Sequence, residues 1–87
     1  MYSKKVTVTN KSGLHARPAS EFTKKSVGFK SQINIEFKGK IINAKSIIGL
    51  LSAGIATGSE IIITAEGEDE QQAVDILVEL IETNFDE

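Results

Sequence analysis

Hydrophobic positions along this chain follow two periods, and the two periods separate strands from helices. Polar and apolar residues alternate in segments typical of half-buried strands, and a further segment rich in isoleucine indicates a more buried strand. These four segments are residues 4–10, 33–37, 40–43 and 60–66. Lys38-Gly39 stands between the second and the third, so it predicts a tight hairpin.

Three other segments place apolar residues three or four positions apart, which predicts amphipathic helices. The helices are expected to begin near Pro18, at the N-cap residue Ser46 and near Asp69. Gly28 and Gly54 lie where the first two helices should end. Asp69 stands three residues before Gln72, which resembles a capping box, and an apolar stripe follows it.

The resulting order, β-α-β-β-α-β-α, predicts an α+β fold. Strands joined partly by a hairpin and partly by helices cannot all be parallel, so a single sheet with helices on one face is the compact solution. Eighty-seven residues leave room for one domain, expected to span residues 1–87. The short second helix is too hydrophobic for one buried stripe. We expect Leu50 and Ala53 to face the core, and the other apolar residues to form an exposed docking patch: Ile47, Ile48 and Leu51.

Composition narrows the class of protein. The chain is 40% hydrophobic and 25% charged, which is typical of a globular protein rather than a disordered chain. It has no cysteine, so disulfides, thiolate zinc sites and thiol catalysis are excluded. The chain offers neither an apolar run near the roughly 20 residues of a membrane span nor a signal-peptide start. We therefore expect a cytoplasmic protein that does not insert into membranes.

Charge is divided unevenly along the chain. Residues 1–45 hold all ten basic residues and two acids, a net +8, whereas residues 46–87 hold ten acids and no base, a net −10. The basic half indicates either an acidic protein partner or nucleic acid, unless folding simply interleaves the two halves. A sheet that binds nucleic acid needs an aromatic stacking platform, and the chain has five aromatic residues in all. Direct nucleic-acid binding is therefore not expected.

The only histidine, arginine and proline of the chain fall within four residues, His15-Ala16-Arg17-Pro18. Pro18 places His15 at or just before a helix N-terminus, where the helix dipole favours neutral imidazole and attracts anions. The backbone N–H groups of Ala16 and Arg17, together with the Arg17 guanidinium, suit phosphate oxygens. This arrangement predicts a transient phosphohistidine, although a lone histidine is more often an ordinary surface residue.

The rest of the sequence limits that chemistry. With one histidine and no cysteine, neither a hydrolytic triad nor a metal cluster can be assembled. No Gly-rich loop ending in Gly-Lys-Ser/Thr is present to bind ATP. We therefore expect a carrier that accepts and passes on a phosphoryl group, not an enzyme, with no cofactor and no metal.

Two segments resemble signatures of a known family. Residues 13–19, Gly-Leu-His-Ala-Arg-Pro-Ala, are similar to the active-site signature of HPr, the phosphocarrier family of the bacterial sugar phosphotransferase system. Residues 43–50, Asn-Ala-Lys-Ser-Ile-Ile-Gly-Leu, resemble the signature around that family's regulatory serine. The resemblance covers nearly the whole chain. It implies an open-faced sandwich with an antiparallel sheet in the order 1-4-2-3 and three helices on one face.

The resemblance also implies roles for individual residues. His15 would accept a phosphoryl group on Nδ1 from phosphorylated enzyme I and donate it to sugar-specific enzyme IIA domains. Arg17 would stabilise the phosphorylated form, and Ser12 would orient the imidazole or the phosphate. The backbone N–H of Ala16 would also bind the phosphate. The exposed patch of the second helix would dock partners, and we expect Ser20 and Lys24 on the first helix to take part.

Ser46 has two interpretations. As an N-cap it has a complete structural role. The resemblance adds a regulatory phosphorylation by an HPr kinase/phosphorylase, with a catabolite-control transcription factor as the partner of the modified form. A purely regulatory protein is the alternative to a phosphocarrier, and retention of His15 counts against it, because one type of paralogue in the family lacks this histidine.

Overall fold

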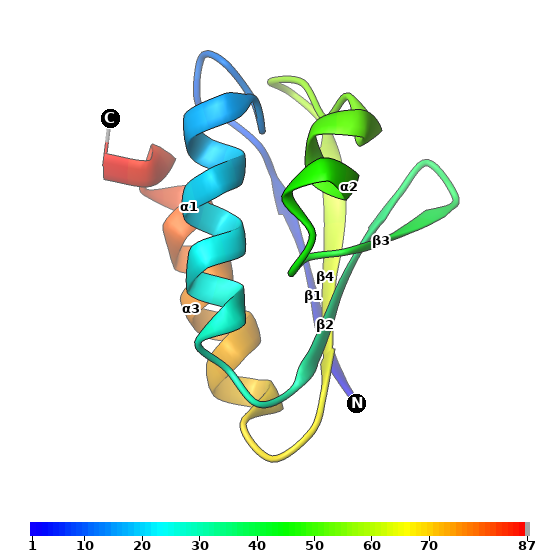
Figure 1. The fold of residues 1–87 in the computed structure, drawn as a ribbon. Coiled ribbons are helices and arrows are strands. Elements are labelled where there is room, and N and C mark those ends of the chain that lie inside the picture. Colours follow the sequence, from blue (N-terminus) through cyan, green and yellow to red (C-terminus); the bar gives the residue numbers. More distant parts are fainter. Residues whose placement is uncertain (87) are drawn as a thin grey trace.

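The computed structural model describes residues 1–86, and Figure 1 shows their arrangement. The elements are β1 (Tyr2–Thr7), α1 (Ala16–Val27), β2 (Gln32–Phe37), β3 (Lys40–Asn43), α2 (Ile47–Ala53), β4 (Glu60–Glu66), α3 (Glu70–Glu82) and the 3-10 turn η1 (Asn84–Asp86). No helix within this part of the chain has the length and apolar character needed to cross a membrane.

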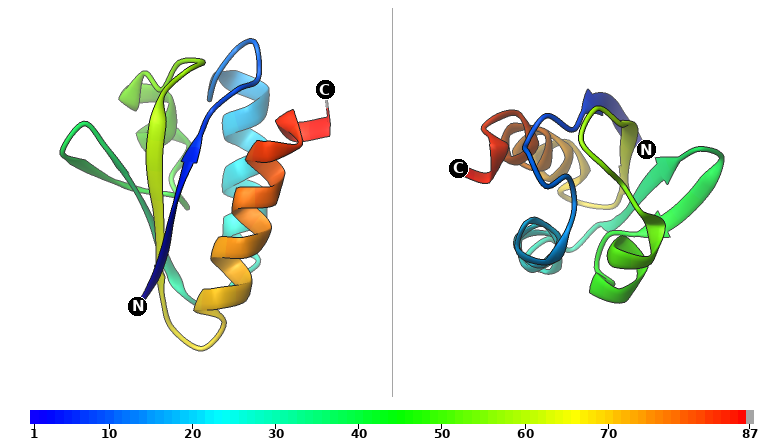
Figure 2. Two further views of the ribbon diagram at one scale, coloured as in Figure 1. Left: turned by 180° about the vertical axis from the view of Figure 1, so that it is seen from behind. Right: turned by 90° about the horizontal axis from the view of Figure 1, so that it is seen from above.

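The four strands form one antiparallel sheet in the order β1-β4-β2-β3. The helices cover one face of this sheet, and α1 contacts both α2 and α3 (Figures 1 and 2). The predicted α+β class, the order 1-4-2-3 and the three helices on one face are therefore confirmed.

The core lies between the sheet and the helices, because each strand turns alternate residues toward them. Ile35 of β2 and Ile63 of β4 are paired in register and fully buried. Phe22 of α1 and Leu77 of α3 are buried against the same core. Leu50 of α2 is also buried, as predicted, whereas Ala53 is only partly buried.

The hairpin between β2 and β3 is confirmed. Both of its turn residues have positive φ, 51° at Lys38 and 79° at Gly39, which matches the right-handed twist of the flanking strands. Glycine adopts this conformation without a steric cost, and the lysine tolerates it in the exposed turn.

The predicted bounds of the first strand are wrong, whereas the start of the first helix is confirmed. The first strand covers Tyr2–Thr7 rather than residues 4–10, because Val8 exchanges backbone hydrogen bonds with Ser59 and Gly58, in the loop before β4. The first helix begins at Ala16, near Pro18 as predicted, with Pro18 in its first turn and His15 as its N-cap residue. Proline is tolerated there because a backbone N–H at that position has no acceptor within the helix.

The predicted capping box at Asp69 is also wrong. Asp69 is the N-cap residue of α3, but its side chain makes no capping bond. Its carboxylate instead accepts hydrogen bonds from the backbone N–H of Lys30, at 2.9 Å, and from the backbone N–H and hydroxyl of Ser31. Asp69 therefore joins the loop before β2 to the start of α3. The Glu70 carboxylate instead accepts a hydrogen bond from the loop before α3, from the backbone N–H of Gly67 at 3.1 Å.

These bonds predict a pH-dependent stability. The Ser31 hydroxyl and then the Lys30 N–H lower the pKa of Asp69 from 3.8 to about 2. A carboxylate with a depressed pKa stabilises the fold fully above its unfolded pKa, and this contribution is lost as pH falls through the folded value. Asp69→Asn should lower the melting temperature at pH 7, and the difference from wild type should shrink between about pH 4 and 2. Glu79→Gln, which neutralises an exposed acid on α3, is the control. An equal loss of melting temperature at pH 7 and pH 2.5 would contradict the role of the Asp69 charge.

Candidate functional site

The loop that leads to α1 is fixed to the segment that leads to β4. The Val8 N–H donates to the Ser59 carbonyl at 2.8 Å, and the Gly58 N–H donates to the Val8 carbonyl at 2.7 Å. Further along, the Leu14 N–H donates to the Ile55 carbonyl at 2.9 Å. The backbone immediately before His15 is therefore held by a neighbouring segment.

Gly13 is needed where these two segments approach each other most closely. Its φ is 62°, and a Cβ atom at this position would lie 2.6 Å from the Ile55 carbonyl oxygen. The buried side chain of Asn10 supports the turn from within, because its amide donates to the Gly13 carbonyl at 2.8 Å and to the Ser12 hydroxyl at 3.4 Å. Gly13 and Asn10 together determine the path of the chain into His15.

His15 is the N-cap residue of α1, in an extended conformation. Its carbonyl accepts the Ala19 N–H at 2.8 Å, while its side chain makes no capping bond and is exposed. The N–H groups of the first helical residues, Ala16 and Arg17, have no acceptors within the helix. The imidazole therefore stands at the positive end of a helix dipole, where an anion is stabilised.

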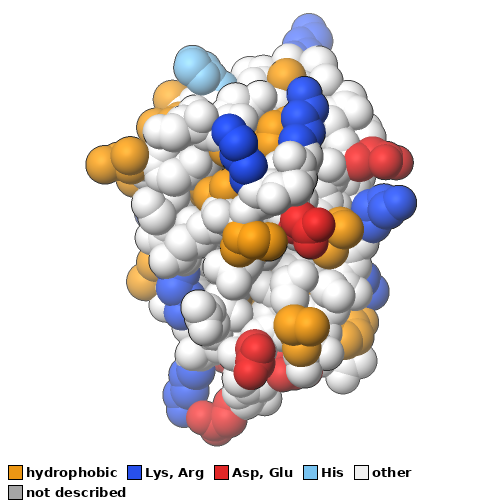
Figure 3. Space-filling view, turned by 90° about the vertical axis from the view of Figure 1, so that its right-hand side faces the viewer, with side chains coloured by type: hydrophobic (Ala, Val, Ile, Leu, Met, Phe, Trp, Pro, Cys, Tyr) orange, Lys and Arg blue, Asp and Glu red, His pale blue; other side chains and the backbone are white. Residues whose placement is uncertain are grey.

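A hollow of about 210 Å³ brings His15 together with residues from three segments. It is lined by Ser12, Leu14, His15, Leu51, Gly54, Ile55 and Ala56. Figure 3 shows the histidine, in pale blue, at the rim of the molecule, with hydrophobic side chains along the same margin. The structure thus places Ser12 beside His15 and also brings Leu51 of α2 to the same hollow.

Arg17 does not line this hollow. Its Nη1 atom lies 2.9 Å from Oε1 of Glu21, one turn along α1, in an ion pair that is partly exposed. Ser20 and Lys24 are exposed on the same helix and follow Arg17 by three and seven positions, so the three share one face. Arg17 is therefore only two residues from His15 in the sequence, but its guanidinium pairs with the Glu21 carboxylate.

A family model described as the phosphorylation site of the PTS HPr component matches residues 2–83, almost the whole chain. The chain belongs to the HPr family. HPr proteins are phosphocarriers rather than catalytic enzymes, which agrees with a site that has one exposed imidazole at a helix N-terminus.

Similar proteins cover this HPr-family chain nearly from end to end. The phosphocarrier protein HPr of Haemophilus influenzae is 46% identical over 83 residues, 95% of this chain and 98% of that protein. The HPr-like protein Crh of Halalkalibacterium halodurans is 49% identical over 82 residues, 94% of this chain and 98% of that protein. A crystal structure of HPr from Thermoanaerobacter tengcongensis has a TM-score of 0.98 at 45% identity and covers 100% of this chain and 98% of its own.

The expected patch of the HPr-family chain is exposed. Ile48 is 74% accessible, Leu51 42% and Ile47 36%, although α2 packs beside α1 and β3. Leu51 also lines the hollow at His15, so this residue of the patch borders the histidine. The role of the patch in docking stays a prediction.

Ser46 caps α2 as predicted. Its hydroxyl oxygen accepts the Gly49 N–H at 3.1 Å, and Gly54 ends the helix in the left-handed conformation. Ser46→Ala should therefore lower the free energy of unfolding by about 1 kcal/mol, whereas Ser46→Asp should retain most of it, because aspartate is also a good N-cap. Urea titration measures both values. If Ser46→Ala had the same free energy of unfolding as wild type, the cap would contribute nothing to stability.

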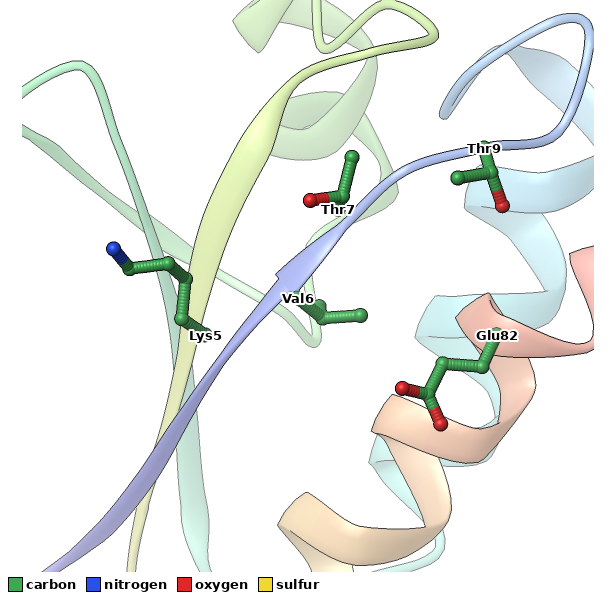
Figure 4. Close-up of a pocket in the computed structure, with 5 residues that line it drawn as sticks. All are labelled: Lys5, Val6, Thr7, Thr9 and Glu82. Carbon is green, nitrogen blue, oxygen red and sulfur yellow. The ribbon is translucent and has the colours of Figure 1, made fainter.

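A larger hollow of about 480 Å³ lies at the β1 edge and contains none of the predicted site residues. It is lined by Lys5, Val6, Thr7, Thr9 and Glu82. Figure 4 shows Val6 pointing toward α3, while Lys5 points away from it, so the lysine and the carboxylate of Glu82 do not converge on one point. Its size alone does not make it the functional site.

Folding partly interleaves the two charge halves of the sequence. Lys4 pairs with Asp75 at 2.9 Å, and Lys30 lies 3.8 Å from Glu68. Hydrogen bonding to Asp75 raises the pKa of Lys4, and Lys4 in turn lowers the pKa of that carboxyl. The acidic loop before α3 lies at the opposite end of the molecule from the loop before His15 (Figure 1). The other end of α3 lies toward the loop before His15, where Glu82 lines one hollow with Thr9, so acidic residues are present at that end as well.

Sequence reasoning missed two residues of the site, Asn10 and Glu21. Glu21 stands four residues after Arg17, a spacing that identifies an ion pair once both are placed on a helix. Asn10 carries no comparable signal, because an asparagine in a polar stretch such as Asn10-Lys11-Ser12-Gly13 is usually an exposed turn residue. Its burial follows from the packing of the neighbouring segment against the loop.

Proposed function

We propose that this HPr-family chain accepts a phosphoryl group on His15 from phosphorylated enzyme I and donates it to sugar-specific enzyme IIA domains. The observation that supports this role is the exposed imidazole of His15 at the N-terminus of α1, without a capping bond of its own. A side chain that contributes so little to the fold, at a position that stabilises anions, is suited to reversible modification. The proposed location is the cytoplasm.

The transfer itself needs no strong base. The lone pair on Nδ1 of neutral His15, with the proton on Nε2, attacks the phosphorus atom. The bond between phosphorus and the donor's nitrogen breaks, and the donor keeps that electron pair. The product is a phosphoimidazole that carries the Nε2 proton, and the reverse of this step passes the phosphoryl group to the next acceptor. Catalysis therefore depends on in-line positioning and on neutralising the phosphoryl oxygens.

The neighbours of His15 would supply that neutralisation. The backbone N–H groups of Ala16 and Arg17 lie at the helix start, and the Arg17 guanidinium provides a planar set of donors. The Ser12 hydroxyl accepts from Asn10, so its own hydrogen is left to donate toward the hollow. A carrier must release its cargo, so these contacts should stabilise the phosphoryl group only modestly.

Partners would dock on the surface around His15. Ile47, Ile48 and Leu51 would supply apolar contact, while Ser20 and Lys24 extend the surface along α1. Enzyme I and the enzyme IIA domains would bind this one surface in turn, because each must reach the same imidazole.

The test is a phosphorylation assay with phosphoenolpyruvate and purified enzyme I, followed by mapping of the modified residue. We expect one phosphate per chain, acid-labile and located on His15, and its transfer to an added enzyme IIA domain. Phosphate on a serine, or none at all, would falsify the proposal. Omission of enzyme I is the control for direct labelling.

A second, regulatory role is proposed for Ser46. The hydroxyl of this residue is partly exposed and adjoins the docking patch at Ile47 and Ile48, so a phosphate there would change the charge of the surface that binds partners. The similarity to a Crh protein and the matching serine signature favour this role. An HPr kinase/phosphorylase would modify Ser46, and a catabolite-control transcription factor would bind the product. Equal affinities of Ser46→Asp and wild type for that factor would argue against the role.

A further inference from the structure

We propose that Glu21 tunes how readily His15 gives up its phosphoryl group, by competing with that group for Arg17. The inference rests on the proposed function, since it concerns the phosphorylated form of His15. Glu21 is a positioning residue in this account, because it acts through Arg17 and does not touch the reacting atoms.

The ion pair has the geometry that such competition requires. Nη1 of Arg17 donates to Oε1 of Glu21 at 2.9 Å, and the two residues are one helical turn apart on α1. Their side chains are 53% and 40% exposed, so water and ligands can reach both partners. Partly exposed pairs of this kind are weak, and the arginine precedes the acid, which is the less favourable order along a helix. Arg17 can therefore exchange Glu21 for a stronger anion.

Phosphorylation of His15 would supply that anion. A phosphoryl group carries nearly two negative charges against the single charge of Glu21, and its oxygens accept a bidentate arginine contact. When Arg17 turns to the phosphoryl group, its bond to Glu21 is lost. The Glu21 carboxylate also remains one turn away, where it repels the new charge. Both effects make the phosphorylated form less stable and its phosphoryl group easier to pass on.

The same helix offers Glu21 a replacement partner. Lys24 and Lys25 line a hollow of about 420 Å³ together with Glu21, Gly28 and Leu80. Lys25 follows Glu21 by four positions, the favourable order for an acid and a base on a helix. Glu21 thus has a cation one turn away on each side along α1. It pairs with Arg17 in the unphosphorylated protein, and in this proposal it pairs with Lys25 once Arg17 has turned to the phosphoryl group. This second pairing limits the competition to a modest adjustment rather than a block.

The experiment compares wild type with Glu21→Gln, which removes the charge and preserves the size of the side chain. Two quantities are measured at low salt: the equilibrium constant for phosphoryl transfer from enzyme I, and the rate of spontaneous hydrolysis of phosphorylated His15. We expect Glu21→Gln to shift the equilibrium toward the phosphorylated protein by about two- to fivefold and to slow hydrolysis. The shift should diminish at 1 M salt, because exposed charges are screened. Glu36→Gln, which changes an exposed acid on β2, should shift neither quantity.

A double-mutant cycle separates competition from a simple change of charge. If Glu21 acts through Arg17, Glu21→Gln in an Arg17→Ala background should shift the equilibrium less than it does alone. Equal shifts in both backgrounds, or no shift in either, would overturn the inference while leaving phosphorylation of His15 intact. A wild-type protein that accepts no phosphoryl group would instead overturn the proposed function, and the inference with it.

Discussion

Replacing His15 with alanine should abolish phosphorylation by enzyme I and leave the stability of the fold almost unchanged. The variant lacks the proposed phosphoryl acceptor, and no other histidine exists in the chain to replace it. The structure predicts the second half of this result, since the His15 side chain is exposed and makes no capping bond. Substitutions at such surface positions change the free energy of unfolding by less than about 0.5 kcal/mol.

The measurement pairs phosphate incorporation with urea denaturation of the same preparations. Phe22→Ala, which removes a fully buried ring, serves as the contrast and should lower the free energy of unfolding by about 3–5 kcal/mol. A His15→Ala protein that still gains acid-labile phosphate would refute the assignment. A large loss of stability in that variant would show that the imidazole has a structural role that the structure does not reveal.

Gly13→Ala, unlike His15→Ala, should lose both stability and phosphoryl transfer. The added Cβ would lie 2.6 Å from the Ile55 carbonyl oxygen and 2.8 Å from the Ala56 Cα, both backbone atoms that cannot rotate away. The φ of 62° adds about 1–2 kcal/mol of strain, and forcing the two segments apart adds roughly 1–3 kcal/mol more. The loop would move, and His15 would move with it.

Gly39→Ala separates these two costs. Gly39 has a φ of 79°, but a Cβ atom there meets nothing within 4 Å. The hairpin variant should therefore show only the conformational strain, about 1–2 kcal/mol, and normal phosphoryl transfer. If Gly13→Ala proved no more damaging than Gly39→Ala, the close approach at Ile55 would not control the site.

The fold could be predicted largely from local patterns. Alternation at Ile33 and Ile35 indicated a strand because one face of the sheet is buried and the other is not. The hairpin at Lys38-Gly39 and the cap at Ser46 were also local, since each depends on residues within four positions. The order of the strands came from the family resemblance and not from these patterns.

What the patterns could not supply depends on contacts between distant segments. Asp69 matched a capping box locally, yet its carboxylate binds Lys30 and Ser31, more than 35 positions earlier in the chain. The hollow at His15 likewise needs Ile55 and Ala56, which approach the loop only when β4 has paired with β1. Local propensity is overruled where a tertiary partner offers better hydrogen bonds.

The backbone hydrogen bonds between the loop before His15 and the segment after α2 have a mechanical consequence. That segment leaves the helix that carries Ile48 and Leu51, and its Ile55 carbonyl binds the amide adjacent to His15, that of Leu14. A force applied to α2 by a bound protein would therefore be transmitted, through the hydrogen bond between Leu14 and Ile55, to the backbone next to His15. If partners bind the exposed face of α2, as proposed, a partner that displaces this helix would also shift the backbone that positions His15.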